Sequence, residues 1–141
     1  MRKILLFLIL FLAIAIAFLN QIAFEKFLYW RFWWFDIMMH FLGGLCISLA
    51  VLWFYFYSGF FKSEFFDKKN KTNILFISVE VVLIIGCGWE IFEFFVGSIG
   101  DLPDTIKDLI MDSVGAILAA EFFLFNFYKK SDRISLTEIE N

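Results

Sequence analysis

The sequence predicts an all-α membrane protein, a polytopic bundle of about four transmembrane helices, and three observations indicate this fold class. Hydrophobic residues make up 62% of the 141 residues, and phenylalanine occurs 22 times against a single proline. The mean hydropathy is +0.81, which is far too apolar for a soluble domain of this size. A helix needs about 20 apolar residues to cross a hydrocarbon core of ~30 Å, and four stretches of the chain reach that length.

The four expected helices span residues 4–24, 35–57, 74–97 and 105–128, and they form a single transmembrane domain over residues 1–128. The aromatic segment 25–34 connects the first two, and its Trp30, Trp33 and Trp34 are typical of an interfacial aromatic belt. The polar loop 58–73 and the tight turn 98–104 make the other connections. Residues 129–141 form a polar tail, which we expect to be cytoplasmic and frayed.

The distribution of Lys and Arg predicts the orientation in the cell (inner) membrane. Of the 12 basic residues, nine lie at the N-terminus, in the loop 58–73 and in the tail, which leaves Lys26, Arg31 and Lys107 on the opposite side. Basic residues accumulate in cytoplasmic segments, so both termini are expected in the cytoplasm. The first segment also resembles a signal peptide, because Arg2-Lys3 precedes an apolar core and Ala15-Ile16-Ala17. Its cleavage would leave the other three orientations unchanged.

Ionisable side chains recur in or at the ends of the last three expected helices. They are Asp36, His40, Glu90, Glu93, Asp104, Asp108 and Asp112. Such groups are costly near hydrocarbon unless they are paired, hydrated or bound to metal. With the predicted orientation all of them fall in the outer half of the membrane. Spacings of three and four residues put those of each helix on one face, so three polar stripes can point at one cavity.

Small residues on the same helices would let the backbones approach closely. They are Gly43-Gly44, Gly86, Gly88, Gly97 and Gly115-Ala116. Simpler roles compete for some of the polar residues. Asp104 begins a helix, Thr105-x-x-Asp108 resembles a capping box, and Asp36 could cap the second helix. His40 could be a satisfied core histidine, but Asp112 and the two glutamates lie too deep for capping.

Six carboxylates around one imidazole cannot all be ionised in a cavity of low dielectric, because like charges and desolvation both disfavour the ionised form. Either several carboxyls hold protons or a divalent cation is bound. Carboxylates with one histidine suit Mn²⁺, Fe²⁺ or Zn²⁺, and Mg²⁺ also accepts such oxygens. The expected metal ligands are His40, Glu90, Glu93, Asp108 and Asp112. The candidate catalytic groups are Asp36 and Asp104, which would orient His40 or serve as general base.

Several function classes are excluded or disfavoured. The net charge of −3 argues against a nucleic-acid partner. Cys46 and Cys87 lie in apolar stretches, so neither a disulfide framework nor a cysteine zinc site is expected. The chain has no His-Glu-x-x-His motif and a single histidine, which excludes zincin-type proteolysis and a two-histidine phosphatase. Neither Ser98 nor Ser113 has the spacing of a serine nucleophile beside His40.

The polar segments together carry a resemblance. Asp36-Ile-Met-Met-His40-Phe-Leu-Gly-Gly44, then Trp89-Glu90-Ile-Phe-Glu93, then Asp104-Thr105-Ile-Lys-Asp108-Leu-Ile-Met-Asp112-Ser-Val-Gly115 resembles the YjdF family of small inner-membrane proteins and, more remotely, the VanZ-like proteins. The match covers about Asp36 to Gly115. The chain has Asp112 where the pattern has Asn, which adds a charge. The resemblance implies a helical membrane fold and no particular reaction.

The leading hypothesis is a carboxylate-rich metal site, open to the outer face, that binds or hydrolyses a polar or lipid-linked substrate. Membrane lipid is the expected partner, and the oligomeric state stays open. The first alternative is a proton- or cation-coupled transporter that uses the same carboxylates. Among acidic residues, the inner halves of these helices hold only Glu80 and Glu121, and this asymmetry favours a one-sided site. The second alternative is a structural subunit whose polar cluster only specifies helix packing.

Overall fold

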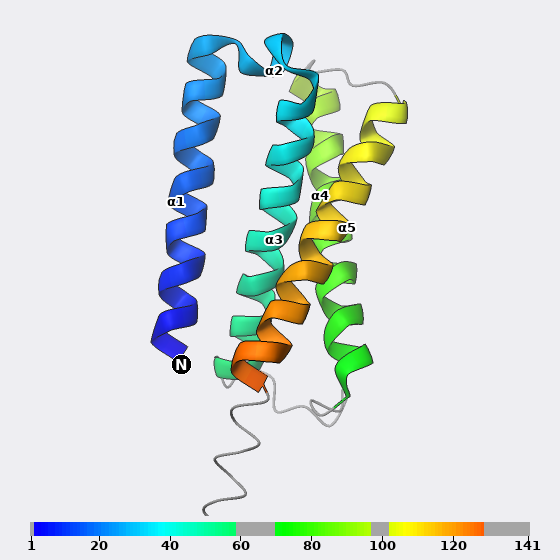
Figure 1. Cartoon of the computed structure of the whole chain (residues 1–141). Coiled ribbons are helices and arrows are strands. Elements are labelled where there is room, and N and C mark those ends of the chain that lie inside the picture. Colours follow the sequence, from blue (N-terminus) through cyan, green and yellow to red (C-terminus); the bar gives the residue numbers. More distant parts are fainter. Residues whose placement is uncertain (1, 59–69, 97–101, 129–141) are drawn as a thin grey trace, which may run out of the picture.

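The computed structural model describes residues 2–58, 70–96 and 102–128, and throughout these ranges the chain is built of helices (Figure 1). The elements are α1 (Arg2–Lys26), α2 (Leu28–Arg31), α3 (Trp33–Tyr57), α4 (Lys71–Val96), α5 (Leu102–Phe123) and the π-helical turn η1 (Leu124–Tyr128). The predicted all-α bundle is therefore confirmed. The expected tail 129–141 and most of the connections 58–73 and 98–104 lie outside the described residues.

The surface of the bundle is apolar where a soluble protein would be polar. Within the described ranges α1, α3 and α4 are long and apolar enough to cross a membrane, with hydropathies of 2.6, 2.0 and 2.1. Large side chains such as Phe7 and Phe95 are 71% and 79% exposed. Surfaces of this kind are stable against lipid and unstable in water. The chain is accordingly a membrane protein.

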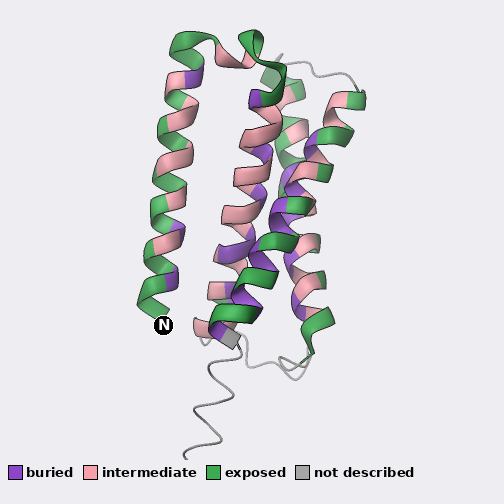
Figure 2. Cartoon of the chain, in the orientation of Figure 1, coloured by how far each residue is buried: buried purple, intermediate pink, exposed green. Residues whose placement is uncertain are grey.

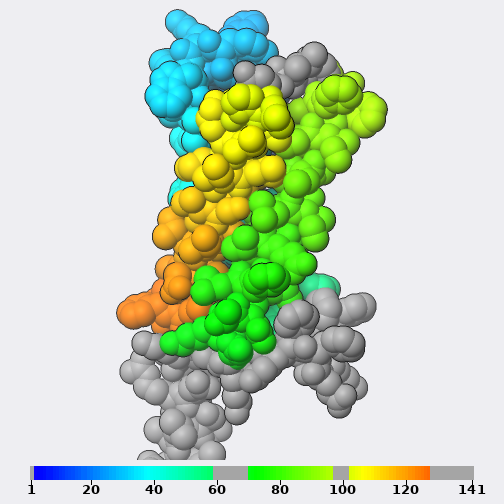
Figure 3. Space-filling model, turned by 90° about the vertical axis from the view of Figure 1, so that its right-hand side faces the viewer, coloured from blue at the N-terminus to red at the C-terminus, as the bar shows by residue number. Residues whose placement is uncertain are grey.

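α5 does not meet the same apolarity criterion, because it carries charged residues on several turns. Its 22 residues still span about 33 Å at the rise of an α-helix. α5 runs from the α2 end of the bundle toward the end that holds the N-terminus, beside α3 and α4 (Figures 1 and 3). Asp108 and Asp112 are buried, so these two charges face neighbouring helices instead of lipid.

α3 lies at the centre of the bundle, where it packs against α1, α4 and most extensively α5. α3 and α5 cross at two glycines. A Cβ atom on Gly44 would collide with the backbone of Asp112, and one on Gly115 would collide with the backbone of Phe41 and Leu45. Because glycine has no Cβ, the two backbones can touch. This contact holds the middle of α5 against the middle of α3.

The remaining glycines differ in what surrounds them. A Cβ on Gly86 would lie 2.5 Å from Asp112 Oδ2, so Gly86 is part of the packing of α4 on α5. Gly43 and Gly88 are not packing positions, since a Cβ on either would meet no atom of the described chain within 4 Å. The prediction that they bring backbones together was wrong, because sequence spacing does not show which side of a helix has a neighbour. Gly97 lies outside the described residues.

The interior changes character along the bundle axis. At the N-terminal end, Leu5 of α1, Leu49 of α3 and Phe123 of α5 belong to one buried apolar cluster. Figure 2 shows the buried positions concentrated where α3, α4 and α5 face one another. Toward the α2 end the buried residues include the ionisable His40 and Asp112. The bundle thus has an apolar half and a half that encloses charged groups.

The connection between α1 and α3 is more ordered than the sequence indicated. It contains the single turn α2, which follows Phe27 with a left-handed φ of 56°. Tyr29 Oη donates a hydrogen bond of 2.7 Å to Asn20 Oδ1, and its ring meets Phe35 edge-on at 5.2 Å. These contacts tie α2 to both flanking helices. Trp33 is 81% exposed, which agrees with a role in an interfacial aromatic belt.

Candidate functional site

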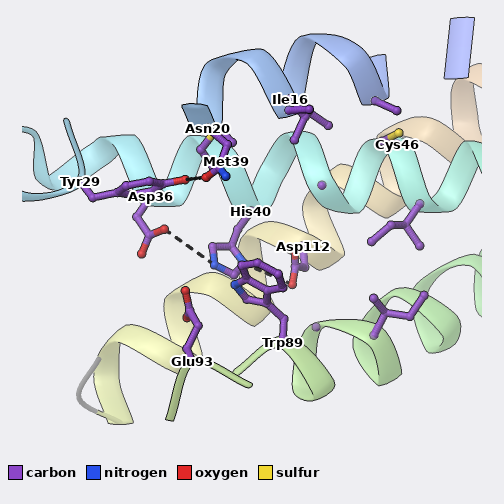
Figure 4. Close-up of a pocket in the computed structure, with 16 residues that line it drawn as sticks. Ile16, Asn20, Tyr29, Asp36, Met39, His40, Cys46, Trp89, Glu93 and Asp112 are labelled. Atoms are coloured by element: carbon purple, nitrogen blue, oxygen red, sulfur yellow. Dashed lines mark hydrogen bonds and ion pairs between the residues drawn. The ribbon is translucent and has the colours of Figure 1, made fainter. Parts of the chain in front are cut away.

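Six of the seven ionisable residues chosen from the sequence converge at the α2 end of the bundle. They are Asp36 and His40 of α3, Glu90 and Glu93 of α4, and Asp108 and Asp112 of α5. Within each pair the spacing of three or four residues sets both side chains on one helix face. Figure 4 shows Asp36, His40, Glu93 and Asp112 directed into a shared space from these three helices.

His40 is the centre of the cluster, and its side chain is only 8% exposed. Its Nδ1 lies 3.5 Å from Asp112 Oδ2, at the limit of a hydrogen bond. Its Nε2 lies 3.9 Å from Asp36 Oδ1 and 4.0 Å from Glu90 Oε1, too far for hydrogen bonds. Two atoms that bind one ion at about 2.1 Å are at most ~4.2 Å apart. Each of the two oxygens is therefore close enough to Nε2 for one ion to bind both atoms.

The potential ligand atoms form two groups that share His40. One atom each from Asp36, His40 and Asp108 lie within 4.8 Å of one another, and the same holds for His40, Glu90 and Glu93. Both groups combine one imidazole with two carboxylates. The sequence assigned Asp36 a catalytic role, whereas the geometry puts its carboxylate among the potential ligands.

Two fully buried carboxylate oxygens in the cluster have no hydrogen-bond partner within the described part of the chain, namely Glu90 Oε1 and Asp108 Oδ1. Asp108 is only 3% exposed. A buried polar atom without a partner is costly, and a carboxylate oxygen is especially so unless it carries a proton or meets a cation. Asp108 also belongs to the group around His40. The buried carboxylate is therefore a second, independent indication that this cluster takes a ligand.

Capping does not explain Asp36 or Asp108. The N-cap of α3 is Phe32, which makes no side-chain capping hydrogen bond, and Asp36 lies four residues further on. Thr105 lies inside α5, and its hydroxyl donates a hydrogen bond of 2.6 Å to Glu90 Oε2 on α4. The expected capping box is thus replaced by a contact between helices. Thr105 was missed as a site residue, although its place one turn before Asp108 on the polar stripe was a usable signal.

Asp104 is the one predicted site residue that stands apart. Its carboxylate forms an ion pair with Lys107 at 3.2 Å, and both side chains are substantially exposed. Asp104 belongs to neither ligand group within the described residues. The ammonium group of Lys107 is therefore occupied by Asp104 on the surface of α5.

A cavity of about 400 Å³ adjoins the cluster and is lined by residues of α1 to α5. Asp36, His40, Glu93 and Asp112 line it, and so do Asn20 and Tyr29, which the sequence analysis did not single out. Burial and the negative charges of Asp36 and Glu93 raise the pKa of Tyr29 to about 12. Its hydroxyl therefore stays a hydrogen-bond donor at physiological pH. Asn20, one of two adjacent amides in the otherwise apolar stretch 4–24 of α1, was the available sequence signal.

Groups that the sequence separated from the cluster also lie outside it in the structure. Glu80 and Glu121 are exposed and belong to neither ligand group of the described chain. Ser113 donates its hydroxyl hydrogen to the backbone oxygen of Leu109 at 2.8 Å, as a structural serine does. Ser98 lies outside the described residues. Cys46 and Cys87 are free thiols.

Comparisons with known proteins give one match. Searches of curated proteins and of solved structures find no match to the chain. A family model described as "Predicted membrane protein (DUF2238)" matches residues 1–129, which include every helix of the bundle. The same family corresponds to the YjdF resemblance of the polar motifs, which is thereby confirmed. The chain belongs to this DUF2238 family of membrane proteins.

Proposed function

We propose that the cluster binds a divalent metal ion in the outer half of the membrane and uses it to bind and hydrolyse a polar or lipid-linked substrate. The carrying observation is the Asp108 carboxylate, which is buried beside His40 and Asp36 with an oxygen that lacks a partner among the described residues. A bound ion would supply both charge and bonds to such an oxygen. Mn²⁺, Fe²⁺ and Zn²⁺ fit a set of carboxylates with one imidazole, and Mg²⁺ is a weaker match.

The proposed ligands are His40, Glu90, Glu93, Asp108 and Asp112. Asp112 accepts from His40 Nδ1 if that nitrogen carries the proton, which would leave Nε2 as the metal-binding atom. Nε2 is also the atom that faces Asp36 and Glu90. Thr105 would then act as a positioning residue, since its hydrogen bond to one oxygen of Glu90 leaves the other oxygen directed at His40.

Asp36 is the stronger candidate for general base. Its carboxylate is half-buried, reaches the cavity and lies beside His40. In a hydrolytic reaction it would accept a proton from the attacking water, whose oxygen bonds to the substrate, and the proton would then pass to the leaving oxygen. Asp104 is the weaker candidate, because its carboxylate is paired with Lys107.

The half of the bundle that holds the N-terminus is apolar inside, which favours a one-sided site over a transport path through the membrane. The described interior there contains a cluster of Leu, Ile, Ala and Phe side chains that includes Leu49 and Phe123, and the hydroxyl of the buried Ser78 donates to a backbone oxygen of its own helix. A proton or cation crossing the membrane would need polar groups along this stretch. Glu80 and Glu121 are exposed on the outside of α4 and α5, so they do not extend the polar cluster inward.

Thermal unfolding with and without metal tests the proposal. A ligand that binds only the folded state raises its stability by mass action. A chelator should therefore lower the melting temperature of the purified protein, and Mn²⁺ or Zn²⁺ should restore it. His40→Ala and Asp108→Ala should weaken this response, whereas Glu80→Ala, an exposed acid on α4, should keep it. A melting temperature of the wild-type protein that changes neither with chelator nor with added ions would contradict metal binding.

A further inference from the structure

The cavity beside the cluster is polar at one end and apolar at the other. Along α3 its lining changes from Asp36 and His40 to Gly43 and Ile47. The eleven steps along the helix from Asp36 to Ile47 cover about 16 Å at the rise of an α-helix. On α1 the lining changes in parallel, from Asn20 to Ala13. A molecule that fills this space needs a polar head and a hydrocarbon tail.

The apolar part of the cavity opens sideways between α1 and α4. α3 forms its floor, and α1 and α4 are not one of the closely packed helix pairs of the described chain. The lining residues Ala13 and Ala17 of α1 and Ile85 and Trp89 of α4 are exposed at the edges of the opening. Figure 4 shows Ile16 and Asn20 of α1 across from Trp89 and Glu93 of α4, with α3 between them. Because α1 and α4 span the membrane, this opening faces the hydrocarbon of the bilayer.

The polar end selects the head group. The lining contains carboxylates, one histidine, Asn20 and Tyr29, and within the described residues it contains neither Lys nor Arg. An anion can approach these carboxylates only if a cation is present, which is the divalent ion of the proposed function. A tetrahedral phosphate has several oxygens that can meet a metal ion while one accepts from the Asn20 amide. The two ligand groups that share His40 would hold the ion at the head of the tail channel.

We propose that the cavity binds a single-chain amphiphile, with its phosphate head at the His40 cluster and its hydrocarbon tail in the channel between α1, α3 and α4. The inference deepens the proposed function and rests on it, because the phosphate requires the metal. It assigns the lipid-linked substrate to the phosphate class and its entry to the lateral opening. Gly43 lines the channel on the α3 side. Asn20 and Tyr29 line it where the tail would meet the head group.

Gly43 and Gly88 provide a matched pair of variants. A Cβ on either glycine meets no described atom within 4 Å, but Gly43 lines the cavity and Gly88 does not. Gly43→Leu therefore fills the channel, and Gly88→Leu adds the same side chain outside it. Leucine is the better helix former, so neither variant should disturb α3 or α4. Ala17→Phe narrows the opening from α1 and serves as a second channel variant.

The experiment is equilibrium binding of dodecyl phosphate to the Mn²⁺-loaded protein in phosphatidylcholine nanodiscs, with empty nanodiscs subtracted. Gly43→Leu and Ala17→Phe should weaken binding by about tenfold or more, which corresponds to the loss of roughly two buried methylenes. Gly88→Leu should bind like the wild type. Butyl phosphate should bind more weakly than dodecyl phosphate, since it lacks most of the tail.

The outcomes separate this inference from the proposed function through the metal content of the same samples. Protein that holds Mn²⁺ but binds dodecyl phosphate equally well in the Gly43→Leu and Gly88→Leu variants would overturn the tail channel and leave the metal site intact. Protein that holds no Mn²⁺ would overturn the proposed function. In that case, if the protein binds dodecyltrimethylammonium but not dodecyl phosphate, and Gly43→Leu weakens this binding while Gly88→Leu does not, the phosphate assignment would be overturned as well.

Discussion

His40 carries the single imidazole of the chain, and the carboxylates of three helices are arranged around it. Its two ring nitrogens face different partners, Asp112 on one side and Asp36 with Glu90 on the other. At the scale of residues, the arrangement is stable only if its excess negative charge is balanced. Protons and a metal ion achieve that balance in different ways, and substitutions distinguish them by the sign of their effect.

The first prediction concerns the buried acids. If a metal is bound, Glu90→Ala, Glu93→Ala and Asp112→Ala each remove a ligand and should lower the melting temperature and any activity more than Glu80→Ala or Glu121→Ala. Metal affinity should fall by at least about tenfold, the lower limit known even for outer partners of ligands. Thermal melts and metal titrations of the five variants provide the measurement.

The opposite sign would favour a cluster without metal. Removing one of several carboxylates that repel one another would then relieve desolvation and like-charge repulsion. A higher melting temperature for Glu90→Ala or Asp112→Ala than for the wild type would therefore count against metal binding. Equal sensitivity of Glu80→Ala and Glu121→Ala would show that the polar cluster is not one site.

At the scale of elements, the crossing of α3 and α5 determines where Asp112 lies. Gly44 and Gly115 are the close contacts of this crossing. We predict that Gly44→Ala lowers stability by about 1–3 kcal/mol, the usual cost of overpacking, because the added Cβ would meet the Asp112 backbone. Metal affinity should fall with it, since Asp112 would move away from His40.

The neighbouring glycine is the control for that prediction. Gly43→Ala places the same methyl group one residue away, where no described atom lies within 4 Å of it. Alanine is favoured over glycine inside a helix by up to about 1 kcal/mol, so this variant should be neutral or more stable. Equal losses in Gly43→Ala and Gly44→Ala, compared by chemical or thermal unfolding, would contradict the described crossing.

The sequence predicts the long helices well, because a run of apolar residues can be counted against the thickness of a bilayer. The expected helix at 4–24 is Arg2–Lys26, and the one at 35–57 is Trp33–Tyr57. α2 was not predicted. It depends on the left-handed Phe27 and on the contact of Tyr29 with Asn20, neither of which has a periodic signal.

The candidate site could be predicted from the sequence one helix at a time. The spacing of residues along one helix fixes their common face, so the polar stripes of α3, α4 and α5 could be identified. Contacts such as Thr105 with Glu90 depend on how the helices are rotated about their axes, which the glycine crossing sets. The ion pair of Asp104 with Lys107 was predictable, since residues three apart on a helix are neighbours.

At the scale of the whole molecule, the bundle has one polar and one apolar half, and the distribution of basic residues predicts that the polar half faces outward. Single cysteines at Lys69→Cys and Ser98→Cys, in a background that lacks Cys46 and Cys87, test this orientation. We predict that a membrane-impermeant thiol reagent labels Lys69→Cys from the cytoplasmic side and Ser98→Cys from the outer side. Labelling of both from one side would contradict the four-helix topology.

The central claim is that the His40 cluster holds a divalent metal ion, and elemental analysis of gently purified protein tests it most directly. Binding of the ion would satisfy the buried oxygens of Asp108 and Glu90 that lack partners in the described part of the chain. The prediction is about one divalent ion per chain in the wild type, a strongly reduced content in Asp108→Asn, and an unchanged content in Glu80→Gln. A wild-type content well below one ion per chain, unchanged in Asp108→Asn and unaffected by prior incubation with Mn²⁺ or Zn²⁺, would contradict the claim.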